Sequence, residues 1–254
     1  MPATMPATMP ARTLAVKVPD VTLMFWTIKI LTTGMGEALS DDLVQRFDPK
    51  LAVLGCAALL GAVLVAQLRA NRYIPWLYWL AVSLVAVFGT MFADVLHVKF
   101  GISLPVSTGG FAGLLVVMFL IWYKAEGTLS IHSITSGRRE WFYWAVVLIT
   151  FALGTAAGDL TAKTFGLGYL GSGVMFVAII AVPAVAWWRL GMAEVTAFWA
   201  AYIVTRPLGA SFADWAAVGP KRGGLDFGFL PVSLVLIAVI VVLVARLPGR
   251  ANPA

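Results

Sequence analysis

The sequence predicts an all-α integral membrane protein with eight transmembrane helices, arranged as four parallel two-helix repeats. Hydrophobic residues make up 61% of the 254 residues and charged residues only 12%, a balance that excludes an ordinary soluble domain. The chain also contains apolar runs of about 20 residues, the length at which an α-helix crosses a bilayer with its backbone hydrogen bonds satisfied internally. We expect eight such helices, at approximately 19–42, 51–70, 74–97, 102–123, 141–163, 168–190, 195–217 and 228–246.

One skeleton of three residue types recurs four times with a fixed internal spacing. An aromatic pair ends in Trp, a Gly follows ten residues after that Trp, and an Asp follows fifteen residues after it. The tryptophans are Trp26, Trp79, Trp144 and Trp199; the glycines are Gly36, Gly89, Gly154 and Gly209; the aspartates are Asp41, Asp94, Asp159 and Asp214. Such repetition determines the fold, and each interval has room for a second apolar segment.

The repeats divide the chain into four units. These cover 19–73, 74–124, 141–193 and 194–248. A loop over 125–140 separates the two halves and is expected in the cytoplasm. Because each unit contains two helices, all units enter the membrane in the same direction, so the predicted symmetry axis lies along the membrane normal. Residues 1–18, with a tandem repeat rich in Pro and Ala, are expected to form a disordered cytoplasmic tail.

The basic residues indicate the orientation of the chain. In an eight-helix arrangement, ten Lys and Arg residues fall in loops on one side and six on the other. The positive-inside rule therefore favours both termini in the cytoplasm. A compact multi-pass chain fits a bacterial inner membrane. We thus interpret the net charge of +6 as a topology signal and not as a nucleic-acid surface. The expected partners are the lipid bilayer and a small ion or small molecule, and a homo-oligomer is compatible with the sequence.

The first helix of each unit has one polar, small-residue face. At 100° per residue, the repeated positions share half of the helix with Lys29, Glu37 and Arg206. Three of the four residues six positions after Trp are threonines that fall on the same half: Thr32, Thr150 and Thr205. The second helices are almost wholly apolar. We therefore expect the first helices of the units to line the inside, with the second helices around them.

Several of these features have a structural as well as a functional interpretation. The tryptophans suit interfacial anchors or core packing, and the glycines suit close helix contacts. The aspartates could cap helix ends or act in function. Lys29, Glu37 and Arg206 differ, because a charge within a membrane span costs several kcal/mol and usually marks a pathway or a charge pair. His97 follows Asp94 by three residues, a spacing that could bind a divalent metal, although the other units have no matching His.

These residues predict a transporter or channel with its path between the first, third, fifth and seventh helices. Four carboxylates at one level would concentrate cations, which favours a proton or a divalent metal as the substrate. A small organic anion bound by Arg206 and Lys29 is one alternative, and a non-transporting sensor or scaffold is another. The sequence contains no catalytic or cofactor-binding motif, so we expect neither enzymatic activity nor a cofactor.

Four tandem units of two spans, each with one Trp, resemble a bacterial membrane-protein family named domain of unknown function three hundred and forty-seven. The resemblance covers approximately residues 19–246 and rests on the Trp, Gly and Asp spacing. It implies an integral bacterial membrane protein and implies no activity.

Overall fold

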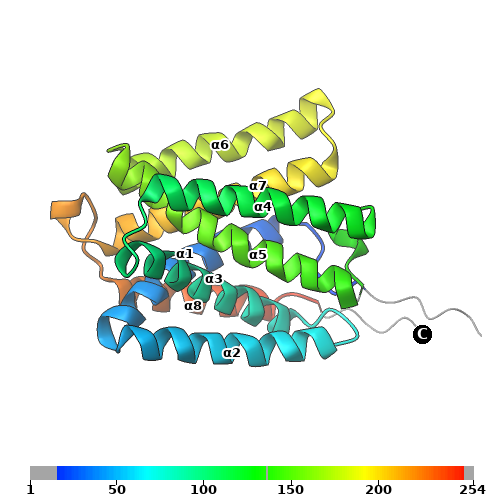
Figure 1. The fold of residues 1–254 in the computed structure, drawn as a ribbon, viewed down its shortest axis with the longest axis horizontal. Coiled ribbons are helices and arrows are strands. Elements are labelled where there is room, and N and C mark those ends of the chain that lie inside the picture. The colour runs from blue at the N-terminus through cyan, green and yellow to red at the C-terminus, as the bar shows by residue number, and fades with distance from the viewer. Residues whose placement is uncertain (1–15, 136, 249–254) are drawn as a thin grey trace, which may run out of the picture.

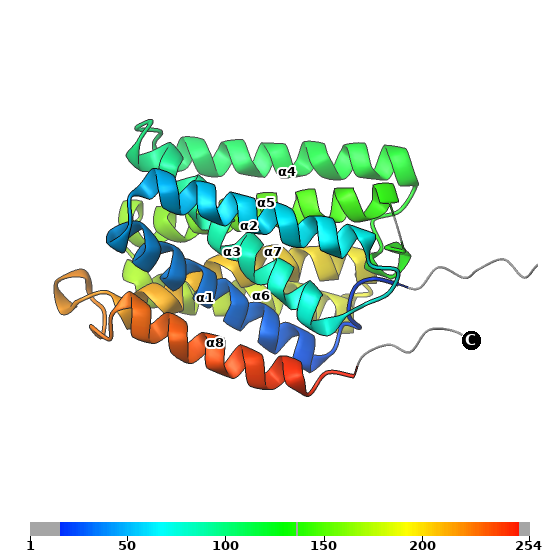
Figure 2. The same ribbon diagram turned by 90° about the horizontal axis from the view of Figure 1, so that it is seen from below.

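The computed structural model describes residues 16–135 and 137–248, and these ranges contain helices and no strands. Eight long helices lie alongside one another as an elongated bundle (Figures 1 and 2). They are α1 (Leu23–Arg46), α2 (Pro49–Arg69), α3 (Pro75–Val98), α4 (Leu104–Glu126), α5 (Gly137–Asp159), α6 (Gly168–Leu190), α7 (Glu194–Ala217) and α8 (Phe229–Ala245). Three short helices connect them: η1 (Ile131–Ser133), the π-helical η2 (Leu160–Thr164) and η3 (Pro220–Arg222). The prediction of an all-α fold is confirmed.

Local sequence signals set the helix ends. The hydroxyl of Thr22 accepts a hydrogen bond from the backbone N–H of Phe25, and the Asp48 carboxylate caps the first turn of α2. Both residues satisfy N–H groups that have no partner within the helix. Gly127 and Gly191 follow α4 and α6 with φ of 69°, the left-handed conformation that glycine adopts without steric cost. Gly127 thus sets the end of α4 at Glu126, two residues beyond 124, the predicted end of the second unit.

The first helices of the four units form a closed inner ring. Helix α1 contacts α3, α3 contacts α5, α5 contacts α7, and α7 returns to α1. The second helices lie outside, but each packs mainly on the first helix of the next unit. Thus α2 lies on α3, α4 on α5, α6 on α7, and α8 on α1. The two helices of a unit are therefore not a packed hairpin, and every unit depends on its neighbour to cover its apolar surface.

The aromatic pairs repeat this cyclic relationship at one end of the bundle, which we call the Trp end. The first aromatic residue of each pair contacts the Trp of another unit. The ring centroids are 5.8 Å apart for Phe25 and Trp79, 5.6 Å for Tyr78 and Trp144, 6.2 Å for Tyr143 and Trp199, and 5.6 Å for Phe198 and Trp26. Trp79, Trp144 and Trp199 are buried, whereas Trp26 is partly exposed. Three of the four tryptophans thus belong to the core.

The repeated glycines allow the inner helices to approach closely. A Cβ at any of them would clash with the following helix of the ring, at a residue seven positions after its Trp. These contacts are Gly36 with Ala86, Gly89 with Phe151, Gly154 with Arg206, and Gly209 with Thr33. Small residues serve the same purpose in membrane helix packing generally.

In the part of the chain that the structure describes, five helices are long and apolar enough to cross a membrane: α2, α3, α4, α6, and α5 together with η2. Helix α8 is apolar and shorter, at 17 residues. Helices α1 and α7 have 24 residues each but carry the charged residues of the bundle interior. Large apolar side chains cover the outer surface, as Leu54 on α2, Val117 on α4 and Val182 on α6 illustrate. Such a surface is typical of helices that face lipid.

The structure corrects two predicted boundaries. Residues 1–15 of the predicted tail lie outside the described residues, whereas Lys17 and Val18 are buried against the bundle. The Lys17 ammonium lies 2.6 Å from the buried carboxylate of Glu140. The predicted loop over 125–140 also contains η1 and the first turn of α5. Hydropathy places this turn outside the helix because it carries Arg138, Arg139 and Glu140.

Candidate functional site

The side chain of Arg206 lies at the centre of the inner ring and is fully buried. Its Nη1 donates a hydrogen bond to the carbonyl oxygen of Thr33 on α1 at 2.6 Å, and its Nε donates to the carbonyl oxygen of Phe151 on α5 at 3.3 Å. Its Nη2 lies 3.2 Å from Glu37 Oε2 and forms a buried ion pair with that carboxylate. The structure thus brings together two of the three charged residues that the sequence predicted inside the helices.

Two threonines bridge the ion pair. Thr90 on α3 and Thr155 on α5 each donate a hydrogen bond to Glu37 Oε2, at 3.2 Å and 3.1 Å. Both hydroxyls also accept a hydrogen bond from Arg206 Nη2. Because Arg206 belongs to α7, Glu37 to α1, and the threonines to α3 and α5, this cluster joins all four inner helices. We call Glu37, Thr90, Thr155 and Arg206 the central cluster.

The two bridging threonines are not among the predicted site residues, although the repeat contains a signal for them. Glu37, Thr90 and Thr155 occupy the same position in their units, directly after the repeated Gly, and Ala210 occupies it in the fourth unit. The position does not stand out in the repeat because its residue type varies. The polar side chains that three of the four units share there are the signal that marks it.

The predicted threonines Thr32, Thr150 and Thr205 are buried but lie outside the central cluster. Each hydroxyl donates a hydrogen bond to a carbonyl oxygen of its own helix, three residues earlier. The acceptors are Lys29 at 2.8 Å, Val147 at 2.6 Å and Tyr202 at 2.6 Å. Such bonds satisfy a hydroxyl within its own helix, so these side chains do not turn toward the Arg206 guanidinium.

Lys29 lies closer to the Trp end than the central cluster. Its Nζ is 4.0 Å from the ring centroid of Phe151 and 4.2 Å from that of Tyr202. The side chain is 1% exposed, and its ammonium has no hydrogen-bond acceptor among the described residues. Aromatic faces attract cations, and the Arg206 guanidinium also lies 4.6 Å from the Phe151 ring. Phe151 therefore contacts both Lys29 and Arg206.

The four repeated aspartates form an acidic layer beyond the central cluster, at the end of the bundle opposite the Trp end. Each follows the Glu37 position by four residues, about 6 Å along its helix. Asp41, Asp94 and Asp214 interact electrostatically with Glu37 and Asp159. Lys163 lies 2.8 Å from Asp159. In residues 16–135 and 137–248, no group of three His, Cys, Asp or Glu side chains is arranged to hold a metal ion.

His97 stabilises the turn between α3 and α4. Its Nδ1 lies 2.8 Å from the carbonyl oxygen of Ile102, and its Nε2 lies 3.2 Å from the hydroxyl of Ser107. Both ring nitrogens therefore have protein partners. Within the described part of the chain, the structure does not complete a metal site around His97 and Asp94.

Comparison with known proteins identifies a family and no activity. No curated protein and no solved structure matches the chain. The family described as Repeat of Unknown Function (DUF347) matches residues 24–73, 77–128, 142–192 and 197–247. Each matched segment contains most of one inner helix and the whole of the outer helix that follows it. The chain therefore belongs to the family Repeat of Unknown Function (DUF347), of which it contains four consecutive copies.

Proposed function

We propose that the protein is a membrane transporter for a small cation, and that the proton is its most suitable substrate. The observation that carries this proposal is the buried Glu37–Arg206 ion pair, which lies between the four inner helices and next to the acidic layer. Charged groups inside membrane proteins are costly to bury and commonly mark substrate or proton pathways. An ion pair is also a costly way to stabilise a bundle, because apolar side chains of similar size often stabilise a core as well.

The proton fits the central cluster better than a divalent metal does. A proton needs only a carboxylate that can gain and lose it, with hydroxyls to relay it, and Glu37, Thr90 and Thr155 supply both. The described residues offer no three-ligand set for a metal. Protonation of Glu37 would remove its charge and weaken its bond to Arg206. The guanidinium would keep its bonds to the Thr33 and Phe151 carbonyl oxygens.

The proposed orientation places the chain in a bacterial inner membrane as a multi-pass protein, with both termini in the cytoplasm. All eight long helices would then cross the bilayer, including the charged α1 and α7. The acidic layer would face the opposite side and draw cations toward Glu37. The arrangement seen here, with Arg206 packed across the axis, would be a closed state of the transporter.

Proton flux into proteoliposomes is the direct test. Wild-type protein should acidify the lumen under an imposed pH gradient and membrane potential, and Glu37→Gln should lower the rate at least about a hundredfold, the lower end of the usual contribution of a proton-transfer group. Asp42→Asn is the matched control, because Asp42 is also a buried carboxylate of α1 but pairs with Arg46. Equal flux in wild type and Glu37→Gln would refute the role of Glu37.

Lys29 favours a small organic anion as the second candidate substrate. Its ammonium lies near Arg206 and has no carboxylate partner among the described residues. Lys29→Met should then abolish uptake of a carboxylate substrate and leave proton flux unchanged. If correctly inserted protein transports neither class of ion, a sensor or scaffold role remains, and the four-helix bonding of Arg206 supports that role.

A further inference from the structure

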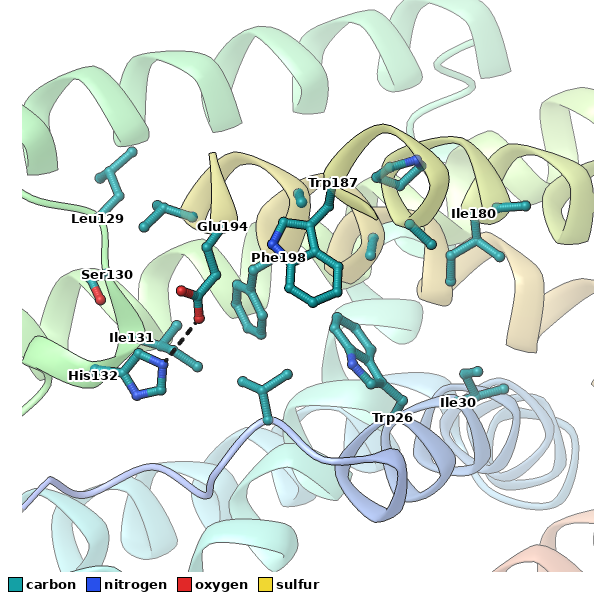
Figure 3. A pocket seen from close by; sticks show the side chains of 17 residues that line it. Trp26, Ile30, Leu129, Ser130, Ile131, His132, Ile180, Trp187, Glu194 and Phe198 are labelled. Carbon is teal, nitrogen blue, oxygen red and sulfur yellow. Dashed lines mark ion pairs between the residues drawn. The ribbon is translucent and has the colours of Figure 1, made fainter. Parts of the chain in front are cut away.

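A cavity of about 530 Å³ lies on the flank of the bundle, between α1, α6 and α7 and the segment that precedes α5. Figure 3 shows Trp26 of α1 and Trp187 of α6 on opposite sides of it, with Phe198 of α7 beside them. Most other lining residues are aliphatic. The polar groups gather at one end, where Glu194 Oε1 lies 3.6 Å from His132 Nε2. We call this cavity the flank pocket.

The flank pocket exists because one helix breaks the cyclic symmetry. Trp187 lies 22 residues after Phe165, and Trp122 lies 22 residues after Phe100, so the two tryptophans are equivalent in the repeat. Trp122 is fully buried, with its ring 5.8 Å from that of Trp199. Trp187 is 57% exposed instead. Trp122 thus fills the space beside Trp199, whereas the equivalent space beside Trp26 is left open.

The residues around the flank pocket define a ligand chemistry. The faces of Trp26, Trp187 and Phe198 offer negative potential to a cation and apolar area to its substituents. The Glu194 carboxylate supplies a full negative charge, and its one ion pair among the described residues is with the exposed His132 ring. The volume lies within the roughly 300–1,000 Å³ of small-molecule sites. Exposed apolar side chains of α6 near the pocket, such as Val185, suit a ligand that dissolves in lipid.

We propose that the flank pocket binds a lipophilic organic cation, such as a quaternary ammonium or phosphonium ion with apolar substituents. The cationic centre lies against the aromatic rings and Glu194, and the apolar groups lie along the aliphatic wall of α1 and α6. A lipid acyl chain could use the same walls, but it would leave the carboxylate at the end of the pocket unused. Binding of such a cation in the flank pocket does not depend on transport through the central cluster.

Tetraphenylphosphonium and tetraphenylborate test this assignment, because the two ions share shape and size and differ in the sign of their charge. Equilibrium binding of each ion is measured with the full chain in nanodiscs of zwitterionic lipid, corrected for uptake by empty nanodiscs. Glu194→Gln removes the charge and keeps the shape of the side chain. Trp187→Ala removes one aromatic face. Trp188→Ala is the matched control, since this neighbouring Trp is 69% exposed and does not line the pocket.

The expected result is saturable binding of the phosphonium ion, weakened at least about tenfold by Glu194→Gln or Trp187→Ala and unchanged by Trp188→Ala. Tetraphenylborate should bind more weakly and should not respond to Glu194→Gln. Equal affinity for the two ions would overturn the cation assignment and leave a merely apolar cavity. Absence of saturable binding would also overturn it, as would a co-purifying phospholipid that Trp187→Ala alone removes.

Discussion

Gly154 of α5 lies directly against the side chain of Arg206 on α7, so closely that a Cβ at position 154 would overlap the Arg206 Cγ. The same repeat positions meet at the three other contacts of the inner ring, where Thr33, Ala86 and Phe151 replace Arg206. A long cationic side chain therefore occupies a site that the cyclic arrangement reserves for close contact. The missing side chain of the glycine makes room for the guanidinium to reach the centre.

This contact predicts that Gly154→Ala destabilises the protein by about 1–3 kcal/mol, the usual cost of overpacking a core. The methyl group would push the aliphatic part of Arg206 away and disturb its bonds to Thr33 and Glu37. Gly158→Ala is the control, because a Cβ there would meet its nearest neighbour at 3.7 Å. Alanine should stabilise that helix position slightly, by up to about 1 kcal/mol. Denaturant unfolding in detergent measures both, and equal effects would contradict the prediction.

The central cluster predicts that its two charges depend on each other. Arg206→Met should lower the free energy of unfolding by about 3–5 kcal/mol, because it leaves the Glu37 carboxylate buried without its cation. Glu37→Gln combined with Arg206→Met should be less destabilising than the sum of the single changes. Arg46→Met provides the comparison. The Arg46 side chain is 55% exposed where it pairs with Asp42, and ion pairs at the surface contribute no more than about 1 kcal/mol. Purely additive effects would argue against a coupled pair.

Much of the fold could be predicted because the interior and the outside of the bundle follow simple patterns. Apolar runs of bilayer length place all eight long helices within a few residues, except where polar residues such as Arg138 and Arg139 open α5. The packing of each outer helix on the next unit could not be predicted. Any apolar face can cover any other, and the spacing of the repeats is the same whichever inner helix an outer helix covers.

The candidate site could be predicted only in part. Glu37 and Arg206 are each predicted on the polar face of an inner helix, and the two side chains do meet. They meet because a buried charge without an opposite charge beside it is costly. Lys29 is also predicted on the polar face of its helix. Among the described residues, however, its ammonium contacts the rings of Phe151 and Tyr202 and no carboxylate. Whether Lys29 or Arg206 pairs with Glu37 depends on how far each side chain reaches across the ring of inner helices. Helical angles alone do not contain that information.

The ion pair between Lys17 and Glu140 predicts that the segment before α1 is fixed to the Trp end. Lys17 Nζ also donates to the carbonyl oxygen of Leu68, and Gln67 donates to the other oxygen of Glu140. Glu140→Gln should weaken this buried arrangement and expose Val18. A Val18→Cys probe in a Cys56→Ala background should react with a maleimide slowly in otherwise native protein and several times faster with Glu140→Gln. Similar slow rates would show that the segment stays in place without the Lys17–Glu140 ion pair.

The distribution of basic residues predicts which end of the bundle faces the cytoplasm. Arg72, between α2 and α3, lies at the Trp end, and Lys221, between α7 and α8, lies at the acidic end; both are exposed. A membrane-impermeant maleimide added to intact cells should label Lys221→Cys and should reach Arg72→Cys only after the membrane is opened, because the richer side of Lys and Arg remains in the cytoplasm. If Arg72→Cys alone were labelled in intact cells, the chain would have the opposite orientation in the membrane. Glu37 would then receive its cations from the cytoplasm. Both sites could instead be labelled before the membrane is opened, while a cytoplasmic marker protein stays unlabelled. In that case α3 to α7 would not cross the bilayer between the two sites. The proposed path between the inner helices would then have to be abandoned.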